Sequence, residues 1–129
     1  MDFQRVFSKA QWESKVGYCR AFKAGRQIYV SGTAPMNEAG TGVFAPGDAT
    51  AQALRCLELI ERALRQLGAD RTSIVRTRMF VTDIERWAEY GRAHAEFFKG
   101  YEPATTMVQV VRLIDPAMLI EIEADAVVP

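Results

Sequence analysis

The 129-residue sequence is poor in the side chains that most often bind metals or form disulfides, with one histidine and two cysteines. Cys19 and Cys56 lie far apart and form no Cys-x-x-Cys pair, so we expect no metal site. Two free thiols are favoured over one disulfide, and we expect Cys19 to be the more accessible of the two. Phosphate-binding and dinucleotide-binding glycine motifs are also missing, so we expect no cofactor.

The sequence also lacks a surplus of charge of either sign. Sixteen Lys and Arg balance sixteen Asp and Glu, which gives a formal net charge of +0. A general nucleic-acid binder and a polybasic membrane-binding protein both need excess cations, so we expect neither activity. No apolar run approaches the ~20 residues of a membrane-spanning helix, and the N-terminal stretch has no apolar signal core. These absences predict a cytoplasmic protein.

No repeat, low-complexity tract or linker divides the chain, so residues 1–129 are predicted to form a single domain. Apolar residues recur every three or four positions in two segments, which predicts helices at residues 49–67 and 84–99. Asp48 and Asp83 precede them as N-caps. The buried stripe of the second helix includes Trp87 and His94, and we expect His94 to be a half-buried, hydrogen-bonded core residue.

Six further segments have the composition and alternation of strands. With the two helices they predict an α+β fold, a mixed α/β sandwich in which one mixed six-stranded sheet is backed by two helices. Two helices cannot cover both faces of the sheet, yet the segment 105–113 is apolar on both sides, with Met107 and Val111 opposite Val108 and Val110. We therefore expect the uncovered face to pack against another subunit, with a half-exposed apolar sheet as the alternative. The predicted strands are residues 3–7, 18–23, 27–31, 73–82, 105–113 and 119–127.

The last strand alternates without interruption and places Glu121, Glu123 and Asp125 on one face. If that face is buried, each carboxylate must find a cation or keep a proton. One interpretation is ion pairing with arginines of other strands; the other is that one carboxyl is a general acid or base with a raised pKa. The candidate partners are Arg76, Arg78 and Arg112.

A second group of candidates lies in the first hairpin. Tyr18 and Arg20 are two residues apart and share a strand face, where a phenol and a guanidinium can bind a small carboxylate or carbonyl. Surface pairing of Arg20 with an acidic residue is the alternative. Ser31 and Gly32 lie at a strand end, where glycine allows a ligand to approach the backbone closely.

These residues stand in a pattern that resembles the Rid family, the YjgF-type reactive-intermediate (enamine/imine) deaminases. The resemblance runs from about Val16 to Val127. It implies a chorismate-mutase-like, YjgF-like fold assembled into a homotrimer, with a small-molecule cleft at each contact between two subunits. Its motifs are Val16-Gly17-Tyr18, Val30-Ser31-Gly32, Phe80-Val81-x-Asp83, Phe97-Phe98, Pro103-Ala104 and Ile120-Glu121-Ile122-Glu123-Ala124.

The resemblance also implies roles for single residues. Tyr18 corresponds to the family's site tyrosine, Ser31 and Gly32 to its Ser-Gly turn, and Glu121 to its water-directing glutamate. In the family, an arginine of a Pro-Ala-Arg stretch holds the carboxylate of a 2-imino acid while water attacks the C=N bond and ammonia leaves.

This sequence departs from that pattern where the arginine is expected, because Thr105 follows Pro103 and Ala104. A hydroxyl does not replace a bidentate, permanently charged guanidinium at an anionic substrate. Met107 makes the same wall more apolar, and Gly91 stands where relatives often carry a polar side chain. One hypothesis is that Arg20 takes over the binding of the anion.

Three functions are consistent with the sequence. The first is a hydrolase of a small imine, enamine or related C–N substrate, in which Glu121 directs water and Tyr18 and Ser31 orient the substrate. The second is a non-catalytic, ligand-binding or regulatory trimer that has lost deaminase activity through Thr105. The third is a ribonuclease, and it is the weakest because the chain has no charge surplus and no histidine pair.

Overall fold

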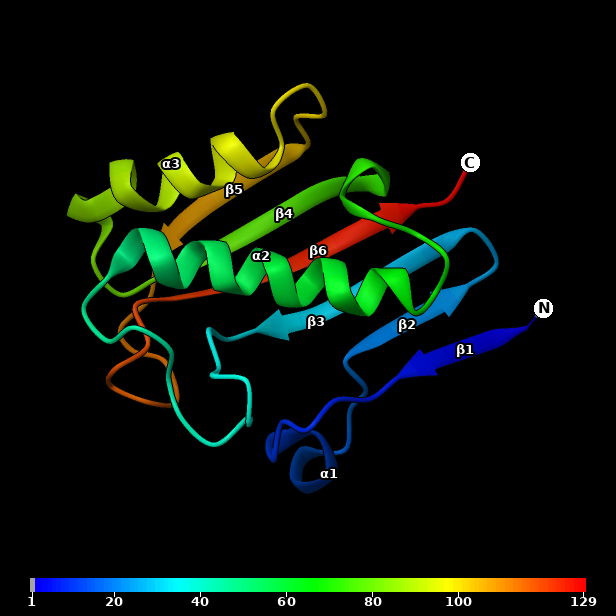
Figure 1. Cartoon of the computed structure of the whole chain (residues 1–129), viewed down its shortest axis with the longest axis horizontal. Coiled ribbons are helices and arrows are strands. Elements are labelled where there is room, and N and C mark those ends of the chain that lie inside the picture. Colours follow the sequence, from blue (N-terminus) through cyan, green and yellow to red (C-terminus); the bar gives the residue numbers. More distant parts are fainter. Residues whose placement is uncertain (1) are drawn as a thin grey trace.

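The computed structural model describes residues 2–129 and confirms the predicted α+β architecture (Figure 1). Six strands form one sheet in the order β1-β2-β3-β6-β4-β5, in which only β4 and β5 are parallel neighbours. The strands are β1 (Phe3–Val6), β2 (Ala21–Ala24), β3 (Gln27–Thr33), β4 (Ile74–Val81), β5 (Ala104–Gln109) and β6 (Ile120–Val127). The helices are α1 (Trp12–Val16), α2 (Ala49–Arg65) and α3 (Trp87–Phe97).

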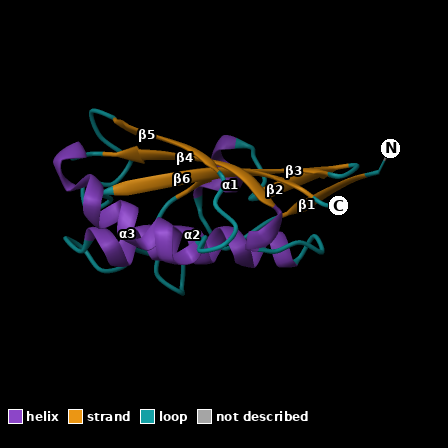
Figure 2. Cartoon of the chain, turned by 90° about the horizontal axis from the view of Figure 1, so that it is seen from above, coloured by secondary structure: helices purple, strands orange, loops and turns teal. Residues whose placement is uncertain are grey.

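Helices α2 and α3 lie side by side on one face of the sheet and leave the other face open (Figure 2). Helix α2 begins where predicted, because the Asp48 side chain accepts a hydrogen bond of 3.0 Å from the amide of Ala51. It ends just before Gly68, whose φ of 78° suits a left-handed residue after a helix. Its apolar stripe packs on β3 and β6 and forms the core of the domain.

Strand β6 runs through the middle of the sheet between β3 and β4. Ile120, Ile122, Ala124 and Ala126 are all buried under the helices, as their alternation predicts. The acidic residues between them consequently point to the open face. This strand positions the candidate carboxylates.

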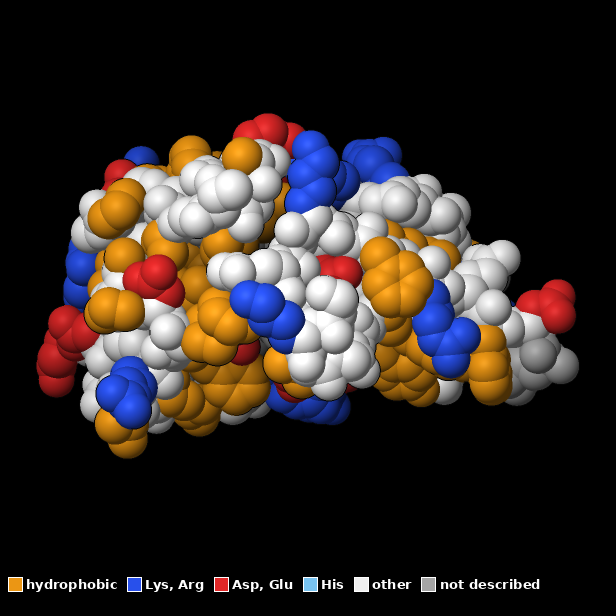
Figure 3. Space-filling model, turned by 90° about the horizontal axis from the view of Figure 1, so that it is seen from below, with side chains coloured by type: hydrophobic (Ala, Val, Ile, Leu, Met, Phe, Trp, Pro, Cys, Tyr) orange, Lys and Arg blue, Asp and Glu red, His pale blue; other side chains and the backbone are white. Residues whose placement is uncertain are grey.

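The open face and the edge of the sheet expose apolar side chains. Tyr29 on β3 and Val108 on β5 lie on this face, and their side chains are 48% and 43% exposed. Val111, beyond the end of β5, is 99% exposed. Hydrophobic side chains also reach the surface along the underside of the molecule, in patches separated by polar and charged ones (Figure 3). No helix within residues 2–129 is long and apolar enough to cross a bilayer.

Five local predictions are wrong. Helix α1 is not predicted, and β5 ends at Gln109 instead of continuing to residue 113. Strand β2 begins at Ala21 instead of residue 18, so Tyr18 and Arg20 lie before it and not on a shared strand face. The second helix starts as a 3-10 turn at Ile84–Arg86, which leaves Trp87 63% exposed instead of buried.

In β4, alternation predicts Val75 on the same face as Met79 and Val81. The register of β4 against β6 shifts between Ile74 and Arg76, so Ile74 is buried and Val75 turns outward. Thr77 stays on the buried side with Met79 and Val81.

Candidate functional site

Glu121 lies on the open face of β6 against Ser31 and Gly32, which lie inside β3. The pairing of β3 with β6 shifts between Val30 and Thr33, so these two residues form an irregularity in the strand beside the carboxyl group. A Cβ atom placed on Gly32 would lie 2.7 Å from Glu121 Oε2. Gly32 is therefore the residue that makes room for the Glu121 carboxyl group.

The surroundings of Glu121 favour its protonated form. Burial raises the pKa of Glu121 above its ordinary value, the nearby Glu123 carboxylate raises it further, and the Arg20 guanidinium opposes both. No ion pair holds Glu121 among the described residues. A half-buried carboxyl with a raised pKa is suited to exchange protons with a ligand.

The other two carboxylates of β6 are ion-paired. Arg78 Nη1 lies 3.2 Å from Glu123 Oε1 and 3.2 Å from Asp125 Oδ2. The pairing interpretation therefore holds for Glu123 and Asp125, through Arg78 alone of the three predicted arginines. Glu121 is left as the candidate acid or base.

Tyr18 and Ser31 line a shallow hollow of about 770 Å³ next to α1, together with Cys19 and Phe22. The Ser31 hydroxyl donates to the carbonyl of Cys19 at 2.8 Å, so its oxygen keeps acceptor capacity toward a ligand. Tyr18 and Ser31 are thus brought to one hollow, and Gly32, the next residue, contacts Glu121.

The Arg20 side chain is not free to bind an anion beside Tyr18. Its Cζ lies 5.6 Å from the centre of the Tyr18 ring, but the residue is only 8% exposed. Arg20 Nη2 donates to the carbonyl of Gly32 at 2.6 Å, and Nη1 lies 3.9 Å from Glu13 Oε2. Arg20 therefore supports the irregularity of β3 beside Glu121, and it lines a cavity other than the Tyr18 hollow.

Thr105 and Met107 lie on β5, at the far edge of the sheet from β1. Thr105 pairs with Thr77, which in turn pairs with the inward-facing Ala124, so these three residues share the helix-covered side. Met107 packs against the core from the same strand. Within one chain, Thr105 and Glu121 are consequently on opposite faces of the sheet.

A chain of hydrogen bonds connects Thr105 to the single histidine. Thr77 Oγ1 lies 2.7 Å from Thr105 Oγ1 and 2.8 Å from His94 Nε2. Burial lowers the pKa of His94 below its ordinary value, so the imidazole stays neutral more readily. His94 is half-buried and hydrogen-bonded, as predicted, but its link to Thr105 could not be predicted from spacing because it depends on how β4, β5 and α3 meet.

Gly91 lies on α3, one turn before His94. A Cβ atom added to Gly91 would meet no atom within 4 Å, so this side of the helix borders open space.

The two cysteines lie as predicted. Cys19 is partly exposed, Cys56 is buried, and both thiols are free. Burial raises the pKa of the Cys56 thiol. Within residues 2–129 no cluster of His, Cys, Asp and Glu is placed to bind a metal ion.

Known proteins share this fold and sequence. The family model described as Endoribonuclease L-PSP matches residues 8–128. The RutC family protein y4sK of Sinorhizobium fredii is 35% identical over 107 residues, which cover 83% of each chain.

Two solved structures are also similar. Rv2704 of Mycobacterium tuberculosis, from the YjgF/YER057c/UK114 family, is 43% identical with a TM-score of 0.88 and covers 98% of this chain and 100% of its own. YyfA of Yersinia pestis, from the Rid family, is 28% identical with a TM-score of 0.87 over 98% of this chain and 100% of its own. The chain therefore belongs to the Endoribonuclease L-PSP family, whose members are also called YjgF or Rid proteins.

Proposed function

We propose that this protein hydrolyses a small imine, enamine or related C–N substrate in a cleft between two subunits of a homotrimer. The observation that carries the proposal is Glu121, a half-buried carboxyl without an ion-pair partner in the described part of the chain, next to a glycine that makes room for it. Tyr18 and Ser31 border a hollow that ends at Ser31, the residue before that glycine, and would orient the substrate.

The proposed reaction adds one water molecule and releases ammonia. The ionised Glu121 takes a proton from the attacking water while the oxygen bonds to the carbon of the C=N group, and it passes that proton to the nitrogen, which gives a carbinolamine. The carboxylate then takes the hydroxyl proton of the carbinolamine and delivers it to the nitrogen, so the C–N bond breaks and a C=O group and ammonia remain. A carboxyl whose pKa is raised toward the working pH serves both steps.

A second subunit is needed because the candidate residues of one chain are divided between two faces of the sheet. Glu121 faces the open side, whereas Thr105 and Met107 stand at the β5 edge on the side of the helices. A cleft containing both sets must take Glu121 from one subunit and the β5 edge from its partner. The exposed apolar residues Tyr29, Val108 and Val111 give such a contact apolar area to bury.

The threonine at position 105 restricts the substrate. Its hydroxyl is engaged with Thr77, and it supplies no positive charge to a carboxylate. We therefore propose a C–N substrate other than the usual amino-acid-derived imines. The same observation favours the second candidate function, a trimer that binds small ligands without chemistry.

The name of the family model also raises ribonuclease activity. On the open face, Arg78 is already paired with Glu123 and Asp125, which reduces the cationic surface that RNA phosphates require. We therefore give this function no role in the proposal.

Ammonia release tests the chemistry directly. The purified protein is incubated with 2-iminopropionate generated enzymatically and with uncharged imines, and ammonia is measured for wild type, Glu121→Gln and Thr105→Arg. Asp125→Asn is the matched control, since it removes a carboxylate from the same face of the same strand. We expect turnover of uncharged imines by wild type and Asp125→Asn, at least a hundredfold loss in Glu121→Gln, and a gain on 2-iminopropionate in Thr105→Arg.

Two results would overturn the proposal. Saturable binding without ammonia from any imine supports the non-catalytic trimer instead. A protein that sediments as a 14.4 kDa monomer has no cleft between subunits.

A further inference from the structure

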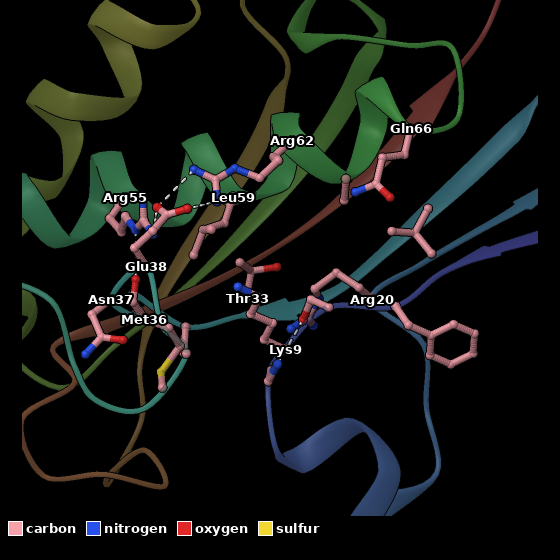
Figure 4. A pocket seen from close by; sticks show the side chains of 17 residues that line it. Lys9, Arg20, Thr33, Met36, Asn37, Glu38, Arg55, Leu59, Arg62 and Gln66 are labelled. Atoms are coloured by element: carbon pink, nitrogen blue, oxygen red, sulfur yellow. Dashed lines mark hydrogen bonds and ion pairs between the residues drawn. The ribbon is translucent and has the colours of Figure 1, made fainter.

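A second cavity lies on the helix-covered side of the sheet (Figure 4). Tyr18, Ser31 and Glu121 are not among the residues that line it. Its volume is about 240 Å³, enough for a molecule of a few carbon atoms. Helix α2 forms one wall and the end of β3 another, and residues 6–10 and 34–40 close the rest. The α2 residues in the wall are Arg55, Leu59, Arg62 and Ala63, and Gln66 follows directly after the helix.

The lining carries more cations than carboxylates. Its four positive side chains are Lys9, Arg20, Arg55 and Arg62, and its one carboxylate is Glu38. Arg55 and Arg62 both contact Glu38, at 3.1 and 3.0 Å, as the dashed lines of Figure 4 show. Lys9 and Arg20 are left without a lining carboxylate.

Arg20 is nine-tenths buried, and its guanidinium is only partly satisfied. Nη2 donates to Gly32, and Nη1 lies 3.9 Å from Glu13, whose carboxylate also accepts from the amide of Ser8 at 2.8 Å. Arg20 Nε is buried and has no hydrogen-bond partner among the described residues. Buried polar groups are nearly always paired, so the protein by itself does not fully satisfy this guanidinium.

The remaining wall is apolar. Leu59 and Ala63 face the cavity from α2, and Val6, Ala34 and Met36 from the loops and strands around it. Such a wall suits a hydrocarbon chain, and the cationic end suits an anion. We propose that this cavity binds a small aliphatic carboxylate, with its charge at Arg20 and Lys9 and its chain against Leu59 and Ala63.

The position of Arg20 connects this site to the candidate active site. Its guanidinium holds the carbonyl of Gly32, the residue that abuts the Glu121 carboxyl group. An anion bound at Arg20 offsets the positive charge that now lowers the pKa of Glu121, so that pKa rises when the cavity is occupied.

Isovalerate is the test ligand, and its uncharged amide, isovaleramide, is the matched probe. Binding to the full-length protein is followed by calorimetry and by amide shifts in NMR spectra. We expect saturable binding of isovalerate with shifts at Thr33, Ala63 and Gln66, and binding of isovaleramide at least tenfold weaker. The Glu121→Gln variant should keep saturable binding of isovalerate and bind it at least as tightly as the wild type, because it removes a negative charge near Arg20. Retained binding in this variant separates the site from the proposed chemistry.

Variants in the wall locate the site. Ala63→Phe fills the cavity without changing its charge and should abolish binding, and the exposed Lys9→Gln should weaken it about threefold to fivefold. Arg65→Gln is the control, because it removes a cation from the same helix outside the cavity. If Ala63→Phe does not fold, the binding of isovalerate to Lys9→Gln still tests the proposed site.

The inference is overturned by any of four results. The first three are no saturable binding at millimolar isovalerate, equal binding of the amide, and binding that Lys9→Gln leaves unchanged. The fourth is amide shifts confined to Tyr18 and Ser31, which would place the carboxylate in the open-face hollow.

Discussion

Replacing Gly32 with alanine tests whether this residue is a glycine in order to accommodate Glu121. The added Cβ atom would lie 2.7 Å from Oε2 and 3.1 Å from Cδ of Glu121, whereas unstrained contacts begin near ~3.5 Å. The carboxyl group must therefore retreat by roughly 0.7 Å. Gly32 is not among the residues with a positive φ, so alanine suits its backbone and the expected effect is steric alone.

Overpacking of this size costs about 1–3 kcal/mol of stability. The penalty should vanish when the carboxyl group is removed, so we expect Gly32→Ala to be nearly neutral in the Glu121→Ala background. The coupling energy of this double-mutant cycle should be about 1–3 kcal/mol. A displacement of the carboxyl group by about 1 Å should also lower turnover about a hundredfold.

Urea unfolding of the four proteins measures the cycle at one fixed protein concentration, since subunit assembly makes stability depend on concentration. Equal m-values are required before the energies are compared. The steric explanation fails if Gly32→Ala costs the same with and without the Glu121 carboxyl group.

Three further predictions concern the hydroxyl of Thr77, the imidazole of His94 and the carboxyl group of Glu121. Thr77→Val breaks both hydrogen bonds of a buried hydroxyl and should cost about 1–3 kcal/mol in urea unfolding, whereas Thr105→Val should cost about 1 kcal/mol or less. Burial lowers the pKa of folded His94, so stability should fall as the pH drops below the unfolded value near 6.5, and His94→Gln should flatten that slope in pH-dependent unfolding. Burial raises the pKa of folded Glu121, so its ionisation opposes folding as the pH rises above about 4.5; Glu121→Gln should therefore stabilise the protein at pH 7 more than at pH 4.

The parts of the fold that follow from local pattern were predictable. Strand β6 alternates over its whole length, and helix α2 has both a capping aspartate and a terminal glycine. The errors arise where a single position departs from the pattern. The irregularity at Val75 turns Ile74 inward and Val75 outward, and alternation alone cannot locate it. Helix α1 has five residues, too few for a periodic signal.

The candidate site was predictable from the sequence only in part. The resemblance to the family indicates Tyr18, Ser31, Gly32 and Glu121. Tyr18 and Ser31 line one hollow, and Gly32 lies against Glu121, while their role in a site stays a prediction. Sequence spacing could not show that Arg20 is buried, since its contacts with Gly32 and Glu13 depend on how β2, β3 and α1 meet. The helix-side cavity was missed for the same reason, because its wall comes from four separate segments of the chain.

The division of the candidate residues between two faces bears on how the protein came to differ from other family members. Glu121 depends on its own chain for its environment, through Gly32 and Arg20. Thr105 depends on Thr77 and His94, which lie beyond the sheet from Glu121. In the proposed assembly a substitution at Thr105 alters the cleft of a neighbour without disturbing the carboxyl group of its own chain. Substrate preference can therefore change at the β5 edge while the proton-transfer group on β6 is retained.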